Sequence, residues 1–251
     1  MKLATTLLAA LTLVGYAHSH AVVYGVWVNG EDQGDGQGKY IRSPPSNDPV
    51  KDLSSPAVAC NVNGSPVSEF VSAAAGDEII VEWYHDSRGD DIIASSHKGP
   101  VQAYIAPYTE GNGADAGWTK IASQGYDSAQ DRWAVDDLIA NKGKLPFKLP
   151  SNLAPGKYLL RHEIIGLHEA DATYDQNPIR GAQFYPSCIQ LEVTGSGSES
   201  PAQNFNLNSG YSYQDPGIHF NLYQCPDPAT GGTTYGCFGE YTAPGPEVWG
   251  A

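Results

Sequence analysis

The sequence predicts an all-β fold, an antiparallel β-sandwich of the immunoglobulin or fibronectin type with long loops and short helices. Three observations support this prediction. Glycine and proline are abundant, at 28 and 18 of the 251 residues, and both residue types interrupt helices and mark turns. Helical periodicity is scarce along the chain. Runs of β-branched and aromatic residues of strand length recur between turn signals.

Five runs are predicted to be the main strands, at residues 21–28, 78–84, 101–106, 157–165 and 183–193. The turn dipeptide Asn29-Gly30 ends the first run, and Pro107 ends the third. Residues 30–57 and 167–182 are predicted to be loops, and residues 107–155 to be mostly irregular with a short helix near 131–141. The Gly/Ser-rich segment 195–200 marks the end of the sandwich core.

Residues 1–19 have the three-part layout of a secretory signal peptide: a cation, an apolar run, and small residues before the cut. The apolar run is too short for a membrane span, which needs about 20 residues. Ala17 and Ser19 favour a cut before His20, although a cut after Ala17 also satisfies the small-residue rule. We therefore expect a secreted protein with one domain, residues 20–251. A terminal His20 would offer its α-amine and its imidazole to a single metal ion.

The chain is acidic, with a formal charge of −14. Removal of Lys2 with the leader makes it more acidic still. Nucleic acid and anionic membranes are disfavoured as partners, because both repel a protein of this charge. A neutral partner such as a glycan is not opposed by the charge.

Four cysteines in a secreted chain suggest two disulfides, and four cysteines allow three pairings. Cys225 and Cys237 flank a Gly/Thr-rich turn and are expected to pair locally. That pairing leaves Cys60 with Cys188, which would join an early loop to a late strand. A zinc site is not favoured, since no C-x-x-C spacing is present.

Histidines are the residues best suited to chemistry in this sequence. His97 lies in a loop just before a predicted strand, where it is well placed to bind a metal. His162 lies within a strand and His168 follows the end of that strand, so only one of the two is expected to face a site. No pair of carboxylates stands out for hydrolysis. The sequence contains no G-x-S-x-G elbow, phosphate loop or dinucleotide fingerprint.

Several unrelated stretches, in order along the chain, resemble one family. They are HAVVYGVWVNG from His20, Ala59–Asn61, Glu82–His85, Ser96–Pro100, Tyr158–Ile165, Leu167–Ala170, Gly181–Cys188, Asp215–Ile218 and Pro244–Pro246. This pattern is similar to that of the fungal lytic polysaccharide monooxygenases active on cellulose, auxiliary activity family nine. The resemblance implies that the leader is cut before His20, and that His162 is structural whereas His168 belongs to the site.

The resemblance implies one copper ion per chain, held by the α-amine and one ring nitrogen of His20 and by a ring nitrogen of His97. Tyr185 would occupy the axial position. Nitrogen donors in one plane suit Cu(II), and copper heads the affinity order of the divalent metals. His168 and Gln183 match a second pair that hydrogen-bonds an oxygen species at the metal, and such partners tune reactivity.

The implied activity is oxidative cleavage of β-1,4-glucans, cellulose and hemicellulose among them, at C1 or C4, with O2 or H2O2 and an external electron donor. The donor would be a small reductant or a secreted dehydrogenase, and the enzyme would be a monomer without a carbohydrate-binding module. Tyr211 matches a tyrosine of the flat substrate-binding face in the family. Five loop residues align with substrate-facing positions: Asn47, His85, Asp86, Glu169 and Arg180.

Two departures from the family pattern lie near the proposed site. Gly166 replaces a more usual alanine, and residues 171–179 lengthen the following loop.

Two other functions compete with the copper enzyme. A glycoside hydrolase would need a carboxylate pair and no copper, and a non-catalytic glycan-binding sandwich would tolerate loss of His97.

Overall fold

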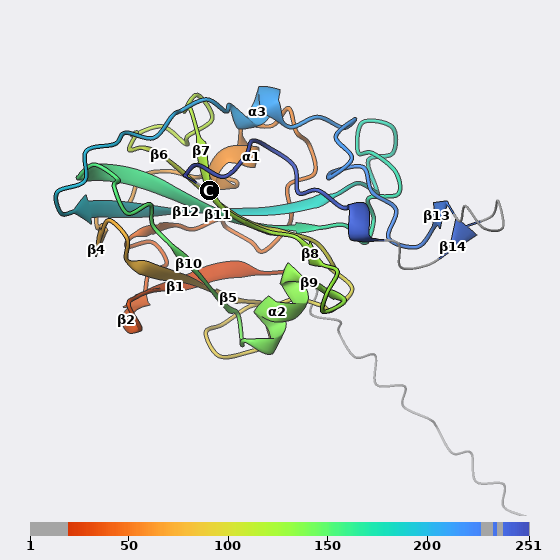
Figure 1. Cartoon of the computed structure of the whole chain (residues 1–251), viewed down its shortest axis with the longest axis horizontal. Coiled ribbons are helices and arrows are strands. Elements are labelled where there is room, and N and C mark those ends of the chain that lie inside the picture. The colour runs from red at the N-terminus through yellow and green to blue at the C-terminus, as the bar shows by residue number, and fades with distance from the viewer. Residues whose placement is uncertain (1–19, 227–232, 235–237, 251) are drawn as a thin grey trace, which may run out of the picture.

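Two packed β-sheets form the body of the protein (Figure 1), as the sequence predicts. A computed structural model describes residues 20–226, 233–234 and 238–250. The four-stranded sheet contains β1 (Val22–Val28), β2 (Glu31–Asp35), β5 (Glu78–Tyr84) and β10 (Lys144–Lys148), in the order β10-β5-β1-β2. The six-stranded sheet contains β3 (Ile41–Arg42), β4 (Val71–Ala74), β6 (Val101–Pro107), β7 (Thr119–Gln124), β11 (Gly156–Gly166) and β12 (Gln183–Thr194).

The remaining elements are short. They are α1 (Ala57–Cys60), α2 (Ala134–Ala140), α3 (Leu207–Gly210), the 3-10 helix η1 (Phe238–Glu240), and the two-stranded pairs β8 (Tyr126–Asp127) with β9 (Arg132–Trp133) and β13 (Cys225–Pro226) with β14 (Thr233–Thr234). The predicted short helix is α2. Asp136 in its first turn accepts a hydrogen bond from the Trp133 N–H at 3.1 Å, an arrangement that stabilises a helix start. Among the described residues, no helix is long and apolar enough to span a membrane.

The longest strands, β11 and β12, pair antiparallel from Gly156 opposite Val193 to Gly166 opposite Gln183. β6 pairs with the other edge of β11. Because the register is continuous, the segment after β11 and the start of β12 meet at one end of the sheet. The start of β6 lies at that same end, so three chain segments converge there.

The apolar residues of these strands alternate between two faces. Leu160, Ile164, Ile189 and Leu191 belong to the cluster between the sheets, together with residues of β1 and β5. Leu159, Phe184 and Cys188 belong to a second cluster on the opposite face of the six-stranded sheet. Loops and the C-terminal segment cover this second face. Trp118 and Phe205 exchange two backbone hydrogen bonds there, at 2.7 and 3.1 Å.

Several short edge strands were not predicted. Residues 30–57 were expected to be loop but include β2, β3 and the start of α1, and residues 107–155 include β7, β8, β9 and β10. β2 (EDQGD) and β10 (KLPFK) lie at the two edges of their sheet. Charged residues and proline are common on edge strands and are not typical strand formers. One pairing is parallel, that of β4 with β12, so the sandwich is not entirely antiparallel.

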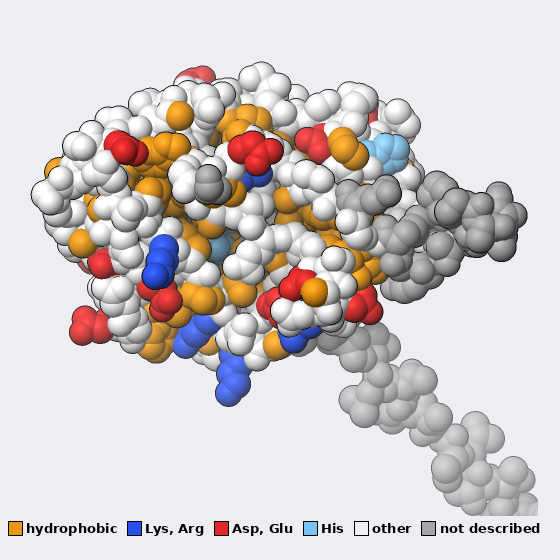
Figure 2. Space-filling view, viewed as in Figure 1, with side chains coloured by type: hydrophobic (Ala, Val, Ile, Leu, Met, Phe, Trp, Pro, Cys, Tyr) orange, Lys and Arg blue, Asp and Glu red, His pale blue; other side chains and the backbone are white. Residues whose placement is uncertain are grey.

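The surface agrees with the composition. Figure 2 shows acidic and basic side chains scattered among neutral ones, with no continuous basic region on the visible face. The leader expected at residues 1–19 lies outside the described residues, and so does Cys237, the expected disulfide partner of Cys225.

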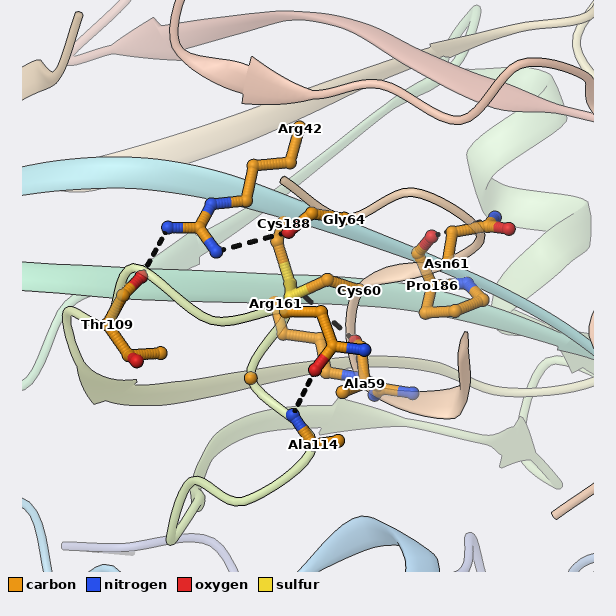
Figure 3. Close-up of a disulfide and its surroundings, with 12 residues drawn as sticks. Arg42, Ala59, Cys60, Asn61, Gly64, Thr109, Ala114, Arg161, Pro186 and Cys188 are labelled. Atoms are coloured by element: carbon orange, nitrogen blue, oxygen red, sulfur yellow. Dashed lines mark hydrogen bonds between the residues drawn. A yellow bond between two sulfur atoms is a disulfide. The ribbon is translucent and has the colours of Figure 1, made fainter. Parts of the chain in front are cut away.

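The disulfide expected between Cys60 and Cys188 is present, with Cα atoms 5.1 Å apart. It joins α1 to β12 across 128 residues of sequence. Two buried arginines hold the surrounding loops (Figure 3). The Arg42 guanidinium donates to the carbonyl oxygens of Thr109 and Gly64 at 2.6 and 3.2 Å. Arg161 donates to the Ala59 carbonyl at 2.8 Å.

Candidate metal centre and substrate face

Four side chains meet where β1, β6, β11 and β12 converge. His20 immediately precedes β1, His97 lies in the turn before β6, His168 follows β11, and Tyr185 lies on β12. Backbone bonds fix the two loops to one another, since the N–H of Leu167 donates to the carbonyl of Lys98 at 2.9 Å. The fold therefore brings together residues that are up to 165 positions apart in the sequence.

His20, His97 and Tyr185 form a nearly equilateral triangle of rings. The ring centroids lie 6.3 Å apart for His20 and His97, 5.9 Å for His20 and Tyr185, and 6.1 Å for His97 and Tyr185. His168 packs on the outer side of His97, with ring centroids 3.9 Å apart. These spacings place the three rings close enough together for a single ion to lie between them.

One atom at this centre has no partner. The Nε2 atom of His97 is buried and lacks a hydrogen-bond partner among the described residues, whereas its Nδ1 lies 3.3 Å from the Ser96 hydroxyl. Buried polar atoms are normally paired, so an exception needs an explanation. A metal ion at the centre of the triangle would supply the missing partner for Nε2.

A hydrogen-bonded row connects Tyr185 to the surface. The Tyr185 hydroxyl donates to Gln183 Oε1 at 2.5 Å, and Gln183 Nε2 donates to Glu169 at 2.9 Å. Lys51 forms an ion pair with the same Glu169 carboxylate at 2.7 Å. Each group in the row orients the next, so Tyr185 and Gln183 are held in fixed positions.

The site favours neutral imidazoles. Burial, followed by the neighbouring His168 and His20, lowers the pKa of His97 to about 3. Burial also lowers the pKa values of His20 and His168, and it raises the pKa of the Tyr185 phenol. At neutral pH the three rings are therefore unprotonated, which is the form that binds metals. Imidazole nitrogens and a phenol oxygen fit a copper ion.

Three of the predicted substrate residues lie together beside His20. Asn47 Nδ2 donates to the His85 carbonyl and to the Asp86 carboxylate, both at 3.3 Å, and Nδ1 of His85 lies 3.0 Å from Asp86. Asn47 and His85 lie close enough to His20 to act on the pKa of its ring. These residues line a hollow of about 320 Å³.

Glu169 and Arg180, the other two predicted substrate residues, lie in the loop after β11. Glu169 belongs to the row described above. Arg180 is paired with Asp171, with its Nε 3.0 Å from the carboxylate. Both contacts stabilise the loop. The charge of Glu169 is balanced by Lys51, and the charge of Arg180 by Asp171.

A second group of potential metal ligands lies in the turn after β5. Ligand atoms of His85, Asp90 and Asp91 all lie within 4.8 Å of one another. The Asp90 carboxylate, however, accepts the backbone N–H groups of residues 85, 86 and 87. This pattern is that of a side chain that shapes its own turn.

Tyr211 was predicted to present its ring to the substrate, and this prediction is wrong. Its side chain is only 3% exposed. The ring packs between Phe184 and Phe205, and its hydroxyl donates to the buried Glu163 carboxylate. Tyr211 follows directly on α3, which turns it into the second apolar cluster.

The exposed tyrosine near the metal centre is Tyr223, which sequence reasoning did not select. It is 50% exposed, and its hydroxyl donates to the His168 carbonyl at 3.2 Å. The preceding Leu222 is buried. Which of these two neighbours is exposed cannot be read from the sequence, because the segment has no regular strand structure whose alternation would indicate it.

His162 is structural, as expected. It is buried on β11, its Nδ1 accepts a hydrogen bond from the Trp83 indole at 3.0 Å, and its ring stacks on Phe147. It makes no contact with His97 or His20 that would bring it into the metal centre.

Comparisons with known proteins show the family to which the chain belongs. Residues 20–235 match the model of Auxiliary Activity family 9, formerly GH61. The chain is 54% identical over 239 residues to an AA9 family lytic polysaccharide monooxygenase A of Collariella virescens, covering 94% of this chain and 83% of the relative. It is 51% identical over 253 residues to the protein of the same description from Schizophyllum commune, covering 96% of each.

Solved structures show the same fold. The structure described as CvAA9A superposes with a TM-score of 0.84 at 54% identity, covering 92% of this chain and 98% of the other. A cellulose-active polysaccharide monooxygenase from M. thermophila has a TM-score of 0.70 at 28% identity, covering 92% and 99%. The chain therefore belongs to Auxiliary Activity family 9, the secreted, copper-dependent lytic polysaccharide monooxygenases.

Proposed function

We propose that the enzyme cleaves β-1,4-glucan chains by oxidation at C1 or C4, and that His20, His97 and Tyr185 would hold the copper ion that this oxidation needs. The observation that carries this proposal is the ring triangle with the buried, unpartnered Nε2 of His97. The family match begins at residue 20, which supports removal of residues 1–19 and a free α-amine on His20.

Copper supplies the redox chemistry by which O2 or H2O2, with electrons from a small reductant or a secreted dehydrogenase, oxidises a C–H bond of the glucan. The residues of the chain prepare that chemistry. The neutral imidazoles of His20 and His97 would provide nitrogen lone pairs. Burial raises the pKa of the Tyr185 phenol, so its hydroxyl stays protonated and donates to Gln183.

Gln183 and His168 would act on the oxygen species beside the metal. Gln183 is held by Glu169. The Nδ1 atom of His168 is buried and has no hydrogen-bond partner among the described residues. A neutral imidazole with a free nitrogen can hold or transfer one proton. Hydroxylation at C1 or C4 makes the carbon unstable, and the glycosidic bond then breaks.

The substrate would lie across the metal centre. The group of Asn47, His85 and Asp86 flanks His20 on one side, and Tyr223 flanks His168 on the other. An aromatic ring offers flat apolar area with a polar edge, which suits the alternating apolar and hydroxylated surfaces of a sugar chain. The cellulose activity of the M. thermophila relative supports a β-glucan substrate.

The test uses the secreted protein with its N-terminus verified by sequencing. We expect an axial Cu(II) electron paramagnetic resonance signal that His97→Ala abolishes and that His219→Ala, a change of an exposed histidine, leaves intact. With cellulose, oxidised oligosaccharides should appear only when ascorbate is added. Unoxidised products that form without copper would indicate a hydrolase. Glucan binding without any products, unaffected by His97→Ala, would indicate a binding module.

A further inference from the structure

A groove of about 510 Å³ opens next to the metal centre, on the side of Tyr223. Six of its lining residues matter here: Ser96, Lys98, Tyr126, Asp131, Trp133 and Tyr223. Ser96 and Lys98 flank the metal-centre histidine His97 in the sequence. Tyr223 belongs both to this groove and to the proposed substrate face. We call this hollow the Tyr126–Tyr223 groove.

The groove combines apolar and polar groups. Figure 2 shows hydrophobic side chains gathered between η1 and the β8, β9 and α2 segment that forms its walls. The Tyr126 hydroxyl donates to the Asp131 carboxylate at 2.5 Å, and Lys98 forms an ion pair with Asp136. Aromatic rings with a few fixed polar groups are the usual composition of small-molecule sites.

One polar group in the wall has no partner. The indole N–H of Trp133 is buried and has no hydrogen-bond acceptor among the described residues. An indole can only donate, and this N–H is fully buried, so the polar groups of the wall that a ligand hydroxyl can reach are the Tyr126 hydroxyl and the exposed Asp131 carboxylate. Anions are not favoured, because Lys98 is compensated by Asp136 and the Asp131 carboxylate adds negative charge. A neutral molecule rich in hydroxyl groups matches these donors and acceptors.

We propose that the Tyr126–Tyr223 groove binds a pyranose unit of a flexible β-glucan whose backbone crosses the metal centre. This inference rests on the proposed function. The flat face of a crystalline substrate cannot enter a hollow, whereas a single chain can bend into it or place a branch there. The groove therefore favours soluble or single-chain glucans over crystalline cellulose. The pyranose belongs either to the chain beyond Tyr223 or to a branch.

The test compares the copper-loaded enzyme with the double variant Tyr126→Phe/Asp131→Asn. This variant removes the hydroxyl and the carboxylate charge but keeps ring packing, and asparagine tolerates the positive φ of 51° at residue 131. The matched control is Tyr108→Phe. Tyr108 also donates to a carboxylate, that of Glu110 at 2.9 Å, but it follows the end of β6 remote from His97.

Calorimetry would measure the affinity for cellotriose, cellohexaose and a xylose-branched glucan oligosaccharide. We expect the double variant to lose about tenfold in affinity for at least one of the two larger ligands, as for two lost hydrogen bonds. Cellotriose binding and the Cu(II) resonance spectrum should not change. A loss with cellohexaose assigns the groove to the main chain, and a loss only with the branched ligand assigns it to a branch.

Equal affinities of the double variant and Tyr108→Phe for every ligand would overturn the inference. That result is distinguishable from failure of the proposed function. If the proposed function itself failed, the unaltered enzyme would bind none of the oligosaccharides or would release no oxidised product from them.

Discussion

The position of the His97 ring depends on its contact with residue 166 of β11. Because residue 166 is glycine, no side chain lies between the His97 ring and that strand. A Cβ atom at this position would lie 3.2 Å from His97 Cδ2 and 3.5 Å from His168 Nδ1. The first distance is tighter than ordinary van der Waals contact, so the His97 ring would have to move. Gly166 thus leaves the two stacked histidines the room that they occupy.

Gly166→Ala should therefore displace the His97 ring. We expect a changed Cu(II) electron paramagnetic resonance spectrum but little change in copper affinity, because the ring needs to shift by only a few tenths of an ångström and the family pattern carries alanine at this position. Gly239→Ala is the control, since nothing lies within 4 Å of a Cβ atom there. If both variants give the spectrum of the unaltered enzyme, the packing of His97 does not govern the metal centre.

Tyr211 and Tyr223 should behave in opposite ways. Tyr211→Phe removes a hydroxyl that is buried with Glu163 and Tyr104, and it should lower the free energy of unfolding by about 1–3 kcal/mol. Tyr223→Ala removes an exposed ring and should change stability by less than about 0.5 kcal/mol. It should weaken cellohexaose binding by roughly 2–10-fold. Urea unfolding and calorimetry check both variants, and the reverse pattern would contradict the assignment.

At the residue scale, prediction from sequence succeeded for residues that lie inside a family motif. It failed for a residue chosen only by its spacing from a motif. The Ser96–Pro100 and Leu167–Ala170 stretches placed His97 and His168 at one site, as the structure shows. Four-residue spacing from Asp215 said nothing about which way Tyr211 points. Its direction is set by its contacts with Phe184 of β12, Glu163 of β11 and Tyr104 of β6, which are distant in sequence.

At the scale of elements, the strands with strong apolar alternation were predictable. β5, β11 and β12 were located to within one residue at each end. Edge strands were not, because pairing with a neighbour imposes extended structure on sequences that carry little strand preference of their own. β10 is an example: Pro146 lies opposite Ile80 of β5, a position that proline tolerates only at a sheet edge.

The buried histidine on β11 should make stability depend on pH. Burial and then the neighbouring Arg161 charge lower the pKa of His162 to about 3, from a usual value near 6.5. Between these values the unfolded chain binds the extra proton. The free energy of unfolding should therefore fall as pH drops below about 6.5, by at most about 1.4 kcal/mol per pH unit from this group.

His162→Asn tests this dependence, because asparagine can still accept the Trp83 hydrogen bond but does not titrate. Urea unfolding between pH 4 and 7 should give a shallower pH dependence for the variant than for the unaltered protein. Parallel curves for the two proteins would show that His162 does not take up a proton on unfolding.

At the scale of the whole molecule, the Cys60–Cys188 bridge links α1 to β12. It lies on the face of the six-stranded sheet that the C-terminal segment covers. Both cysteines are fully buried. Closing a loop of 128 residues restricts the unfolded chain, an effect worth about 2–5 kcal/mol. Cys60→Ala/Cys188→Ala should lower the free energy of unfolding by that amount. The remaining folded protein should keep its Cu(II) spectrum, because neither residue contacts the metal centre.

An unchanged unfolding free energy in the double cysteine variant would show that the bridge is not a stabilising element.

The pairing of Cys60 with Cys188 and the sandwich architecture were predictable from sequence. The order of strands in each sheet was not, because the sequence does not show which edges meet. The parallel pairing of β4 with β12 depends on such a meeting, since residues 75–182 separate the two strands.

The central claim is that a free His20 amine and His97 together bind copper. The most direct measurement is copper affinity, with the accompanying Cu(II) spectrum, for the protein beginning at His20 and for the same protein with one alanine added before it. The account predicts that the added residue, which converts the amine into an amide, removes most of the affinity and changes the spectrum. Equal affinities and identical spectra would contradict it.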